Sequence, residues 1–189
     1  MIALADTYLD ETAERYRSRV VEILGAEVKV LASFVLGSGL VGGYRPGKSD
    51  LDLVAVIDRP LRGEARRRAV ERIATLELPG RRLELAVYVQ GRQPPDFDLN
   101  LEVDEDGVRE APDEAEHWFV IDAAIAQERI PEWSEYFDRV SETRTRAAVE
   151  ESLAWSAAWP ELEFARLNAA RARHYLEHGE WISKPKEER

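Results

Sequence analysis

The chain has 189 residues, 44% of them hydrophobic and 33% charged, which is enough apolar material for the buried core of one compact domain or two small ones. The chain has a formal net charge of −11 and therefore lacks the basic surface of a duplex nucleic-acid binder. It has no cysteine, which excludes disulfides and Cys-based metal sites. No apolar run approaches the roughly 18 residues of a membrane span, so we expect a cytoplasmic protein with no nucleic-acid or membrane partner.

The first half of the chain alternates between helical and strand-like patterns. Its first residues (MIALADTYLDETAERY) lack the basic and then apolar segments of a signal peptide, and hydrophobic side chains at helical spacing predict an amphipathic helix over residues 7–23 instead. Residues 29–36 are apolar and partly β-branched, which predicts a strand that ends at Gly37 and Ser38. A glycine-rich loop over residues 39–49 follows.

Further strands and one helix are predicted before residue 110. Residues 50–57 alternate and then become continuously apolar, and residues 82–89 are largely apolar, as expected for two strands. The pattern of residues 63–76 predicts a helix between them. A short strand over residues 98–103 is predicted to close in an Asp-Gly turn at residues 106–107.

The second half of the chain has a helical pattern throughout. A helix is predicted over residues 112–128, with acidic residues in its first turn, where the helix dipole favours them. Another begins at Ser141, and a third runs over residues 160–178, from a first-turn proline to a terminal glycine. The predicted fold is α+β, with a mixed sheet flanked by helices over residues 1–110 and an α-helical domain over residues 111–189.

Two aspartates stand one residue apart at the head of the second predicted strand. Because side chains alternate along a strand, Asp50 and Asp52 point to the same face, and two like charges so close repel each other unless a cation lies between them. A hard, oxygen-seeking cation such as Mg²⁺ turns this cost into binding. Glu84 is a lone charge within a later strand, and pairing of the two strands brings it to the aspartates as a third ligand or a general base.

The loop before these aspartates has features of a phosphate site. Gly37 lets the backbone approach a phosphate closely, and the Ser38 hydroxyl with neighbouring N–H groups can hold its oxygens. Ser49 can act in the same way, and Arg45 and Lys48 can neutralise phosphate charge. An Asp-x-Asp pair or a Gly-Ser pair alone is common by chance. Their order and spacing, with a third carboxylate on a later strand, predict a site for a divalent metal and a nucleotide triphosphate.

The chain resembles the nucleotidyltransferase superfamily of the DNA polymerase β type. The resemblance lies in a Gly-Ser pair, followed after eleven residues by Asp-Leu-Asp and then by a carboxylate on a later strand. The stretch GSGLVGGYRPGKSDLDLVAVI resembles more narrowly the aminoglycoside O-adenylyltransferases that act on streptomycin and spectinomycin. The resemblance extends over residues 30–185, through RRLELAVYV, HWFVIDAAIA, SLAW and LNAARARHYLEHGEWISK.

The resemblance implies a Mg²⁺-dependent enzyme that transfers AMP from ATP to a hydroxyl of an aminoglycoside and releases pyrophosphate, which is an antibiotic-resistance activity. It implies that Asp50 and Asp52 hold Mg²⁺, and that Glu84 contacts the substrate hydroxyl and takes its proton. The residues implied to contact the phosphates in this half of the chain are Gly37, Ser38 and Ser49.

The helical half is implied to complete the site. Asp122 matches an acidic position that faces the nucleotide, and Lys184 matches a lysine that reaches the phosphates. Glu161 and Glu163 stand where the family places an acidic side chain for the cationic drug, and Trp155 matches a tryptophan that packs on it. For two of these residues a role in the fold is the alternative to a role in drug binding. Trp155 can belong to the core or a domain interface, and Glu161 is a favourable residue in the first turn of a helix.

Other functions stay open at the level of sequence. The same chemistry can serve another acceptor, such as a protein, a tRNA or another small molecule. A non-catalytic nucleotide-binding relative is a further hypothesis, against which the presence of all three carboxylates counts. The family continues with more helices after its Ser-Lys pair, whereas this chain ends at Arg189, which predicts an abbreviated or truncated helical domain. We expect a monomer.

Overall fold

The computed structural model describes residues 8–110 and 116–182. The helices are α1 Glu11–Gly25, α2 Gly37–Leu40, α3 Gly63–Ala74, α4 Glu116–Arg129, α5 Glu142–Ala158 and α6 Glu163–His178, with a 3-10 helix η1 at Pro131–Glu135. The strands are β1 Val30–Val35, β2 Leu51–Ile57, β3 Leu83–Val89, β4 Leu99–Asp104 and β5 Gly107–Glu110. Within the two described ranges, no helix is long and apolar enough to cross a membrane.

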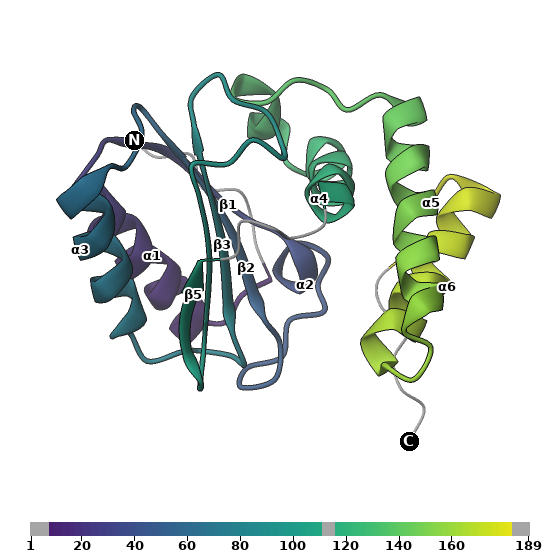
Figure 1. The fold of residues 1–189 in the computed structure, drawn as a ribbon, viewed down its shortest axis with the longest axis horizontal. Coiled ribbons are helices and arrows are strands. Elements are labelled where there is room, and N and C mark those ends of the chain that lie inside the picture. Colours follow the sequence, from purple (N-terminus) through teal and green to yellow (C-terminus); the bar gives the residue numbers. More distant parts are fainter. Residues whose placement is uncertain (1–7, 111–115, 183–189) are drawn as a thin grey trace.

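The strands form one mixed sheet in the order β1-β2-β3-β4-β5, as Figure 1 shows. β2 and β3 run parallel, and the other neighbouring pairs are antiparallel. Helix α3 lies between β2 and β3 in the chain, because parallel strands need a crossover connection rather than a tight hairpin. This order puts the strands that carry Asp52 and Glu84 side by side.

Helices α1 and α3 cover one face of the sheet (Figure 1). Alternation along β2 sends Leu51, Leu53, Ala55 and Ile57 into the core under these helices, where each is at most 3% exposed. Full burial of an aliphatic side chain stabilises the fold by about 1.5–3 kcal/mol. This apolar row therefore anchors β2 and, through the pleat, directs its polar residues to the opposite face.

Helix α4 lies against the opposite face of the sheet, and α5 and α6 pack beyond it (Figure 1). Val54 and Val56 of β2 share a hydrophobic core with Val120 of α4 and Tyr175 of α6. Trp133 of η1 is also part of this core and is 1% exposed. The helical half thus packs directly on the face of β2 that carries Asp52. The division of the chain near residue 110 stays a prediction.

The predicted strands are present, with ends that differ by at most one residue from those expected. The first helix begins at Glu11 rather than at residue 7, because the Asp10 carboxylate accepts a hydrogen bond from the Ala13 N–H (2.8 Å) and caps the helix there. The predicted start at Ser141 is confirmed in the same way, since its side chain accepts a hydrogen bond from the Arg144 N–H (3.3 Å).

Three short elements were not predicted, and one of them is the 3-10 helix η1. Residues 37–40 form the single turn of α2 rather than the beginning of a loop. The predicted turn at residues 106–107 leads into β5, whose four residues are all exposed. Such a strand buries no side chain, so it leaves no hydrophobic pattern in the sequence. Its pairing with β4 through the backbone is what defines it.

The predicted start of the last helix at Pro160 is wrong. The Leu162 N–H donates to the Trp159 carbonyl (3.1 Å), which closes a turn, and α6 begins only at Glu163. Its predicted end is confirmed at Gly179, which adopts a left-handed conformation with φ of 73°. The predicted start of the helix at Pro112 lies outside the described residues.

Candidate functional site

A row of charged residues crosses the sheet on the face that packs against α4. The register of the strands sets Asp52 opposite Glu84, Glu84 opposite Glu102, and Glu102 opposite Arg109. Residues that lie opposite each other in neighbouring strands point to the same face, so three carboxylates from β2, β3 and β4 stand side by side. Like charges in this arrangement repel and need cations beside them.

Asp50 stands immediately before β2, and its side chain is 17% exposed. The Arg81 guanidinium donates to both of its carboxylate oxygens, from Nε to Oδ1 (2.9 Å) and from Nη2 to Oδ2 (2.7 Å). Arg82 Nη2 makes a longer contact with Oδ2 (3.3 Å). Burial alone works to raise the pKa of Asp50. The hydrogen bond from Arg81 and the charges of both arginines outweigh it and lower the pKa.

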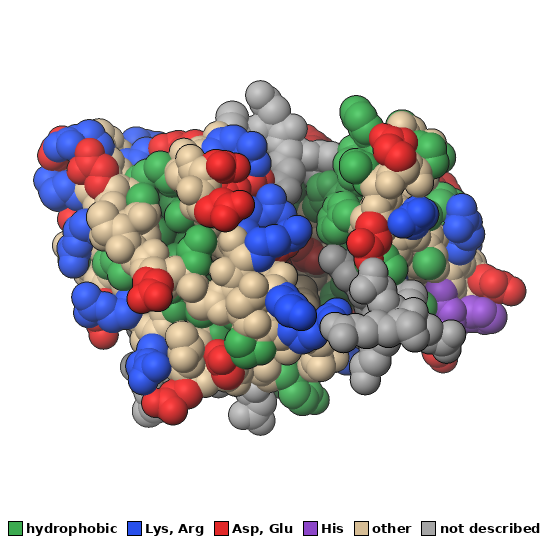
Figure 2. Space-filling view, turned by 90° about the horizontal axis from the view of Figure 1, so that it is seen from below, with side chains coloured by type: hydrophobic (Ala, Val, Ile, Leu, Met, Phe, Trp, Pro, Cys, Tyr) green, Lys and Arg blue, Asp and Glu red, His purple; other side chains and the backbone are tan. Residues whose placement is uncertain are grey.

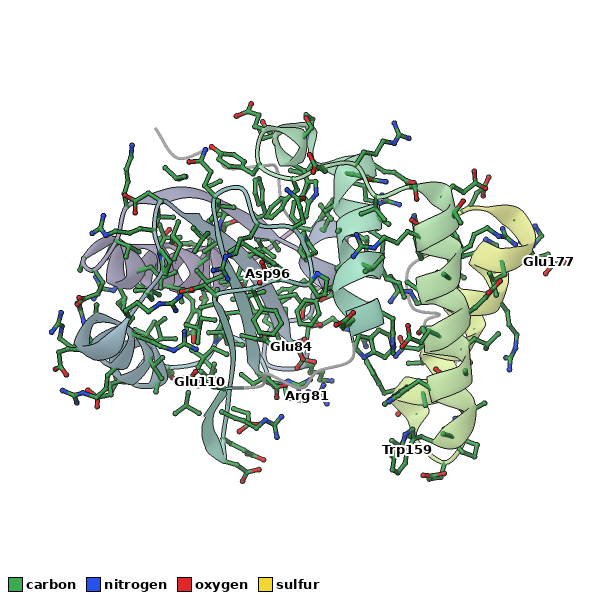
Figure 3. The ribbon with its side chains drawn as sticks, turned by 45° about the horizontal axis from the view of Figure 1, so that its top comes forward. Arg81, Glu84, Asp96, Glu110, Trp159 and Glu177 are labelled. Atoms are coloured by element: carbon green, nitrogen blue, oxygen red, sulfur yellow. The ribbon has the colours of Figure 1, made fainter. Side chains whose placement is uncertain are left out.

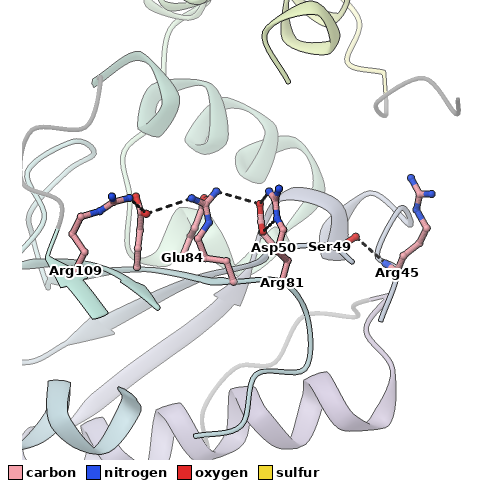
Figure 4. A network of polar contacts seen from close by, with 8 residues as sticks. Arg45, Ser49, Asp50, Arg81, Glu84 and Arg109 are labelled. Carbon is pink, nitrogen blue, oxygen red and sulfur yellow. Dashed lines mark hydrogen bonds and ion pairs between the residues drawn. The ribbon is translucent and has the colours of Figure 1, made fainter. Parts of the chain in front are cut away.

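Arg82 connects the carboxylates of the row (Figure 4). Its Nη2 pairs with Glu84 as well as with Asp50, and its Nη1 lies 3.4 Å from Glu102 Oε2. Glu102, 7% exposed, also pairs with Arg109 across the strand pair. Burial opposes the charge on Arg82, but the surrounding carboxylates outweigh it and raise the Arg82 pKa. The predicted carboxylates are therefore brought together, and arginines hold them.

Gly37 is required where the chain passes Asp52. Its φ is +51°, and a Cβ built on it would lie 1.7 Å from Asp52 Oδ2. The Leu36 N–H donates to the Asp52 carbonyl (2.9 Å), which ties this turn to the head of β2. Ser38 follows in the first turn of α2, and its carbonyl accepts from the Gly43 N–H (2.9 Å). The predicted Gly-Ser pair and the aspartate therefore meet at one point.

Ser49 has a structural task in the loop before β2. Its hydroxyl accepts a hydrogen bond from the Arg45 N–H (2.9 Å), and its carbonyl accepts one from the Arg81 N–H (3.0 Å). The loop also runs close to Gly80, where a Cβ would come within 2.2 Å of the Ser49 carbonyl oxygen. Ser49 thus orders the approach to Asp50, and its predicted role in phosphate binding stays a prediction.

The donor set fits a hard divalent cation. Within residues 8–110 and 116–182, no group of three or more His, Cys, Asp or Glu side chains is arranged around one metal position. Mg²⁺ usually takes only one or two carboxylates together with waters and substrate phosphates, and Asp50 and Asp52 supply that number. The space left by the missing side chain of Gly37 accommodates the Asp52 carboxylate. A cation bound to Asp50 would displace the arginines that now contact it.

The helical half adds a cation that the sequence analysis missed. Arg171 of α6 is half-buried, and burial lowers its pKa against the opposing charges of Asp122 on α4 and Asp52 on β2. The predicted Asp122 thus faces an arginine from α6 that also interacts with the head of β2. The sequence signal was present, since Arg171 follows Asn168 by three positions on the face of α6 that buries Asn168 and Ala172.

A small pocket lies between α4, α5 and α6 and includes Arg171 in its lining. It is lined by Trp118, Ile121, Val149, Ser152, Asn168, Arg171, Ala172 and Trp181. Among the described residues, Asn168 Nδ2, Arg171 Nε and Trp181 Nε1 are buried donors without a hydrogen-bond partner. The pocket is on the helical side of the site and does not include the carboxylates, so Arg171 is the residue that connects the two places.

The predicted drug-binding residues lie around the hairpin between α5 and α6. The Trp155 ring centroid is 5.5 Å from that of Trp118 and 6.2 Å from that of Phe164, both in edge-on geometry. Glu161 and Glu163 are exposed. The Trp155 side chain therefore packs in an aromatic cluster, as its structural alternative expected, and the cluster reaches the surface at Phe164, which is 44% exposed. Lys184 lies outside the described residues.

The two halves of the molecule face each other across a hollow. Figure 2 shows Lys and Arg side chains on the sheet side of this hollow and hydrophobic side chains on the helical side. Arg81 and Glu84 lie at the same end of the molecule as Trp159, at the tip of the α5–α6 hairpin (Figure 3).

Comparison with known proteins shows the fold. No protein-family model matches the chain, and no curated protein matches it either. Among solved structures it is similar to spectinomycin adenyltransferase AAD(9) from Enterococcus faecialis, determined with ATP and spectinomycin, with a TM-score of 0.68. The likeness covers 90% of this chain and 79% of that chain, at 17% sequence identity. At this identity the likeness shows that the two proteins share a fold, and it shows nothing more.

Proposed function

We propose that the protein transfers AMP from ATP to a hydroxyl of an aminoglycoside such as streptomycin or spectinomycin and releases pyrophosphate, with Mg²⁺ as the metal. The observation that carries the proposal is the register of β2 and β3, which sets Asp52 opposite Glu84 with Asp50 at the head of the same strand. The fold likeness to an adenyltransferase determined with ATP and spectinomycin supports the same activity.

In the proposed reaction, the substrate hydroxyl oxygen attacks the α-phosphorus of ATP, the bond between that phosphorus and the bridging oxygen breaks, and pyrophosphate leaves. Glu84 takes the hydroxyl proton on a carboxylate oxygen, which makes the attacking oxygen a better nucleophile. Asp50 and Asp52 would hold Mg²⁺, which when bound neutralises the charge that builds up on the phosphate oxygens. Glu84 lies directly opposite Asp52, so the proton acceptor is next to the phosphate site.

The nucleotide is proposed to bind between the turn at the head of β2 and the helical half. Gly37 and Ser38 offer backbone N–H groups and a hydroxyl to phosphate oxygens. Arg171 interacts electrostatically with Asp52, so its guanidinium can neutralise a triphosphate bound there. Asp122 would orient this arginine, and Lys184 is proposed to add a second cation from the helical half. Ser49 would act by ordering the loop that carries Asp50.

The acceptor is proposed to lie against the α5–α6 hairpin. Aminoglycosides carry several cationic groups, and the exposed Glu161 and Glu163 can attract them. Trp155 and Phe164 present an aromatic surface on which the apolar faces of sugar rings can pack. This arrangement would bring a drug hydroxyl toward Glu84.

Transfer of radiolabel from [α-³²P]ATP to streptomycin and to spectinomycin tests the proposal. We expect Asp52→Asn to lower the rate by at least about 100-fold, because a ligand of the metal is lost. Asp96→Asn is the matched control, since the Asp96 side chain is 67% exposed and pairs only with Arg92 among the contacts described. Full transfer by an Asp50→Asn and Asp52→Asn double variant would refute the metal assignment. Labelling of a protein or tRNA but of neither drug would favour another acceptor.

A further inference from the structure

Arg82 lies beside the aspartates proposed to bind a metal, and it contacts carboxylates on three neighbouring segments. Its side chain is 26% exposed, and its Nη2 contacts Asp50 Oδ2 (3.3 Å) and Glu84 Oε1. Its Nη1 lies 3.4 Å from Glu102 Oε2 on the next strand. One guanidinium thus interacts with the head of β2, with β3 and with β4.

The contacts of Arg82 compete with the functions proposed for its partners. A divalent cation on Asp50 would share carboxylate oxygens with a guanidinium and repel it, because both carry positive charge. Glu84 has the same conflict, since a carboxylate paired with a guanidinium is a weaker proton acceptor. Asp50 and Glu84 can therefore perform their proposed roles only when Arg82 moves away from them.

Glu102 is an alternative ion-pair partner for the Arg82 guanidinium. It lies opposite Glu84 in the β3–β4 register, it already contacts Arg82 Nη1, and it is 7% exposed. Arg82 Nε is buried without a hydrogen-bond partner among the described residues, so the present arrangement leaves a donor unused. A two-point contact of the guanidinium on Glu102 would use such a donor and would keep the Arg82 charge paired.

We propose that Arg82 is a positioning residue that exchanges with the divalent cation: cation binding at Asp50 and Asp52 moves its guanidinium from Asp50 and Glu84 onto Glu102. The exchange frees the Glu84 carboxylate at the moment the metal arrives, so the proton acceptor becomes available only in the loaded site. This inference rests on the proposed nucleotidyl transfer and assigns Glu102 a role as the alternative partner of Arg82.

Arg81 differs from Arg82 in a way that the test can use. It pairs with the same aspartate, but its side chain is 65% exposed. The Glu84 charge acts on it only as the weakest of several influences, and the contacts described include no ion pair between Arg81 and Glu102. An exposed arginine can leave its partner for water with little penalty. Arg81 thus carries the same charge beside the same aspartate without the exchange partner, and Arg81→Gln is the matched control.

Titration of the full-length protein with Mn²⁺, followed by the electron paramagnetic resonance signal of the free ion and without nucleotide, measures the exchange. Mn²⁺ prefers the same oxygen ligands as Mg²⁺. We expect Arg82→Gln to bind Mn²⁺ about ten-fold or more tightly than wild type, because a charge-assisted contact no longer has to be broken. Arg82→Met serves as a second variant in case the amide of glutamine finds a new partner.

Glu102→Gln separates exchange from a general effect of charge. In the wild-type background it removes the place to which Arg82 moves, so we expect Mn²⁺ to bind several-fold more weakly. In the Arg82→Gln background Glu102→Gln should not change the Mn²⁺ affinity, because no arginine at position 82 can move onto residue 102. In the Arg81→Gln background it should weaken binding as in wild type.

Three results would overturn the exchange. Unchanged or weaker Mn²⁺ binding by both Arg82 variants would show that Arg82 does not compete with the cation. An equal effect of Glu102→Gln in the presence and absence of Arg82 would show that Glu102 acts only through its charge. If the Arg82 variants bind no Mn²⁺ at all, Arg82 supports the cation site and does not compete with the cation. Failure of the proposed function is a different result: the exchange is measured as expected, but no AMP is transferred to any acceptor.

Discussion

Replacing Gly37 by alanine is a direct test of the site at the head of β2. The backbone of Gly37 has φ of +51°, and a Cβ there would lie 1.7 Å from Asp52 Oδ2 and 2.7 Å from its Cγ. Neither contact can be relieved by a few tenths of an ångström, so the carboxylate must turn away from its present position. The substitution therefore combines backbone strain with the displacement of a proposed metal ligand.

The two effects can be estimated separately. A left-handed backbone costs a non-glycine residue about 1–2 kcal/mol. For a protein of this size each kcal/mol lowers the melting temperature by about 2–4 °C, so we expect a decrease of about 2–8 °C. Changes in the surroundings of a metal ligand alone weaken metal binding by about 10–100-fold, and displacement of Asp52 itself should reach at least the upper end of that range.

The assay combines scanning calorimetry with Mn²⁺ titration on Gly37→Ala and on a control, Gly63→Ala. Gly63 has nearly the same φ (+49°), but a Cβ there would meet no described atom within 4 Å. The melting temperature of the control should therefore decrease by a similar amount, and its metal affinity should not change. Wild-type metal affinity in Gly37→Ala would refute the placement of Asp52 in the metal site, whatever happens to the melting temperature.

Other predictions follow from single contacts. Glu84→Gln is expected to lower kcat by about 10²–10⁴-fold and to keep Mg²⁺–ATP binding in calorimetry; loss of nucleotide binding would instead make Glu84 a metal ligand. Ser141→Ala removes the acceptor for the Arg144 N–H and should cost about 1 kcal/mol, measured by urea unfolding; an unchanged midpoint would contradict the cap. Burial lowers the pKa of His117 below its ordinary 6.5. Below that pH the unfolded chain takes up a proton that the folded chain does not, so stability should fall as the pH drops from 6.5 toward the lowered pKa. His117→Gln should flatten this slope, and a wild-type slope in the variant would refute the assignment.

Local features of the site were predictable because they depend on neighbours in the chain. Asp50 and Asp52 stand two residues apart at the head of an apolar strand, and the period of a strand decides that such residues share a face. The need for glycine before the aspartates was also visible in the sequence. Its cause was not, because the contact between Gly37 and the Asp52 carboxylate joins segments fifteen residues apart.

The partners of the carboxylates required the tertiary structure. Arg82 precedes Glu84 by two residues in the sequence, and nothing local predicts that it also contacts Asp50 and Glu102 from other elements. Arg171 interacts with Asp52 only because α6 shares a hydrophobic core with α4 and with the face of β2 that carries Asp52. Such contacts depend on how elements pack, and local propensity carries no information about them.

The sequence by itself determined the α+β class and the strand at whose head the aspartate pair stands, since alternation, glycine placement and helical spacing are properties of short segments. That Asp50 and Asp52 hold a metal stays a prediction. The tertiary structure decided the register that sets Asp52 opposite Glu84, because the parallel pairing of β2 and β3 depends on the crossover through α3 and on the core beneath it. It also decided that arginines hold the carboxylates, since a partly buried cluster of like charges is stable only with cations that the fold brings from other strands and helices.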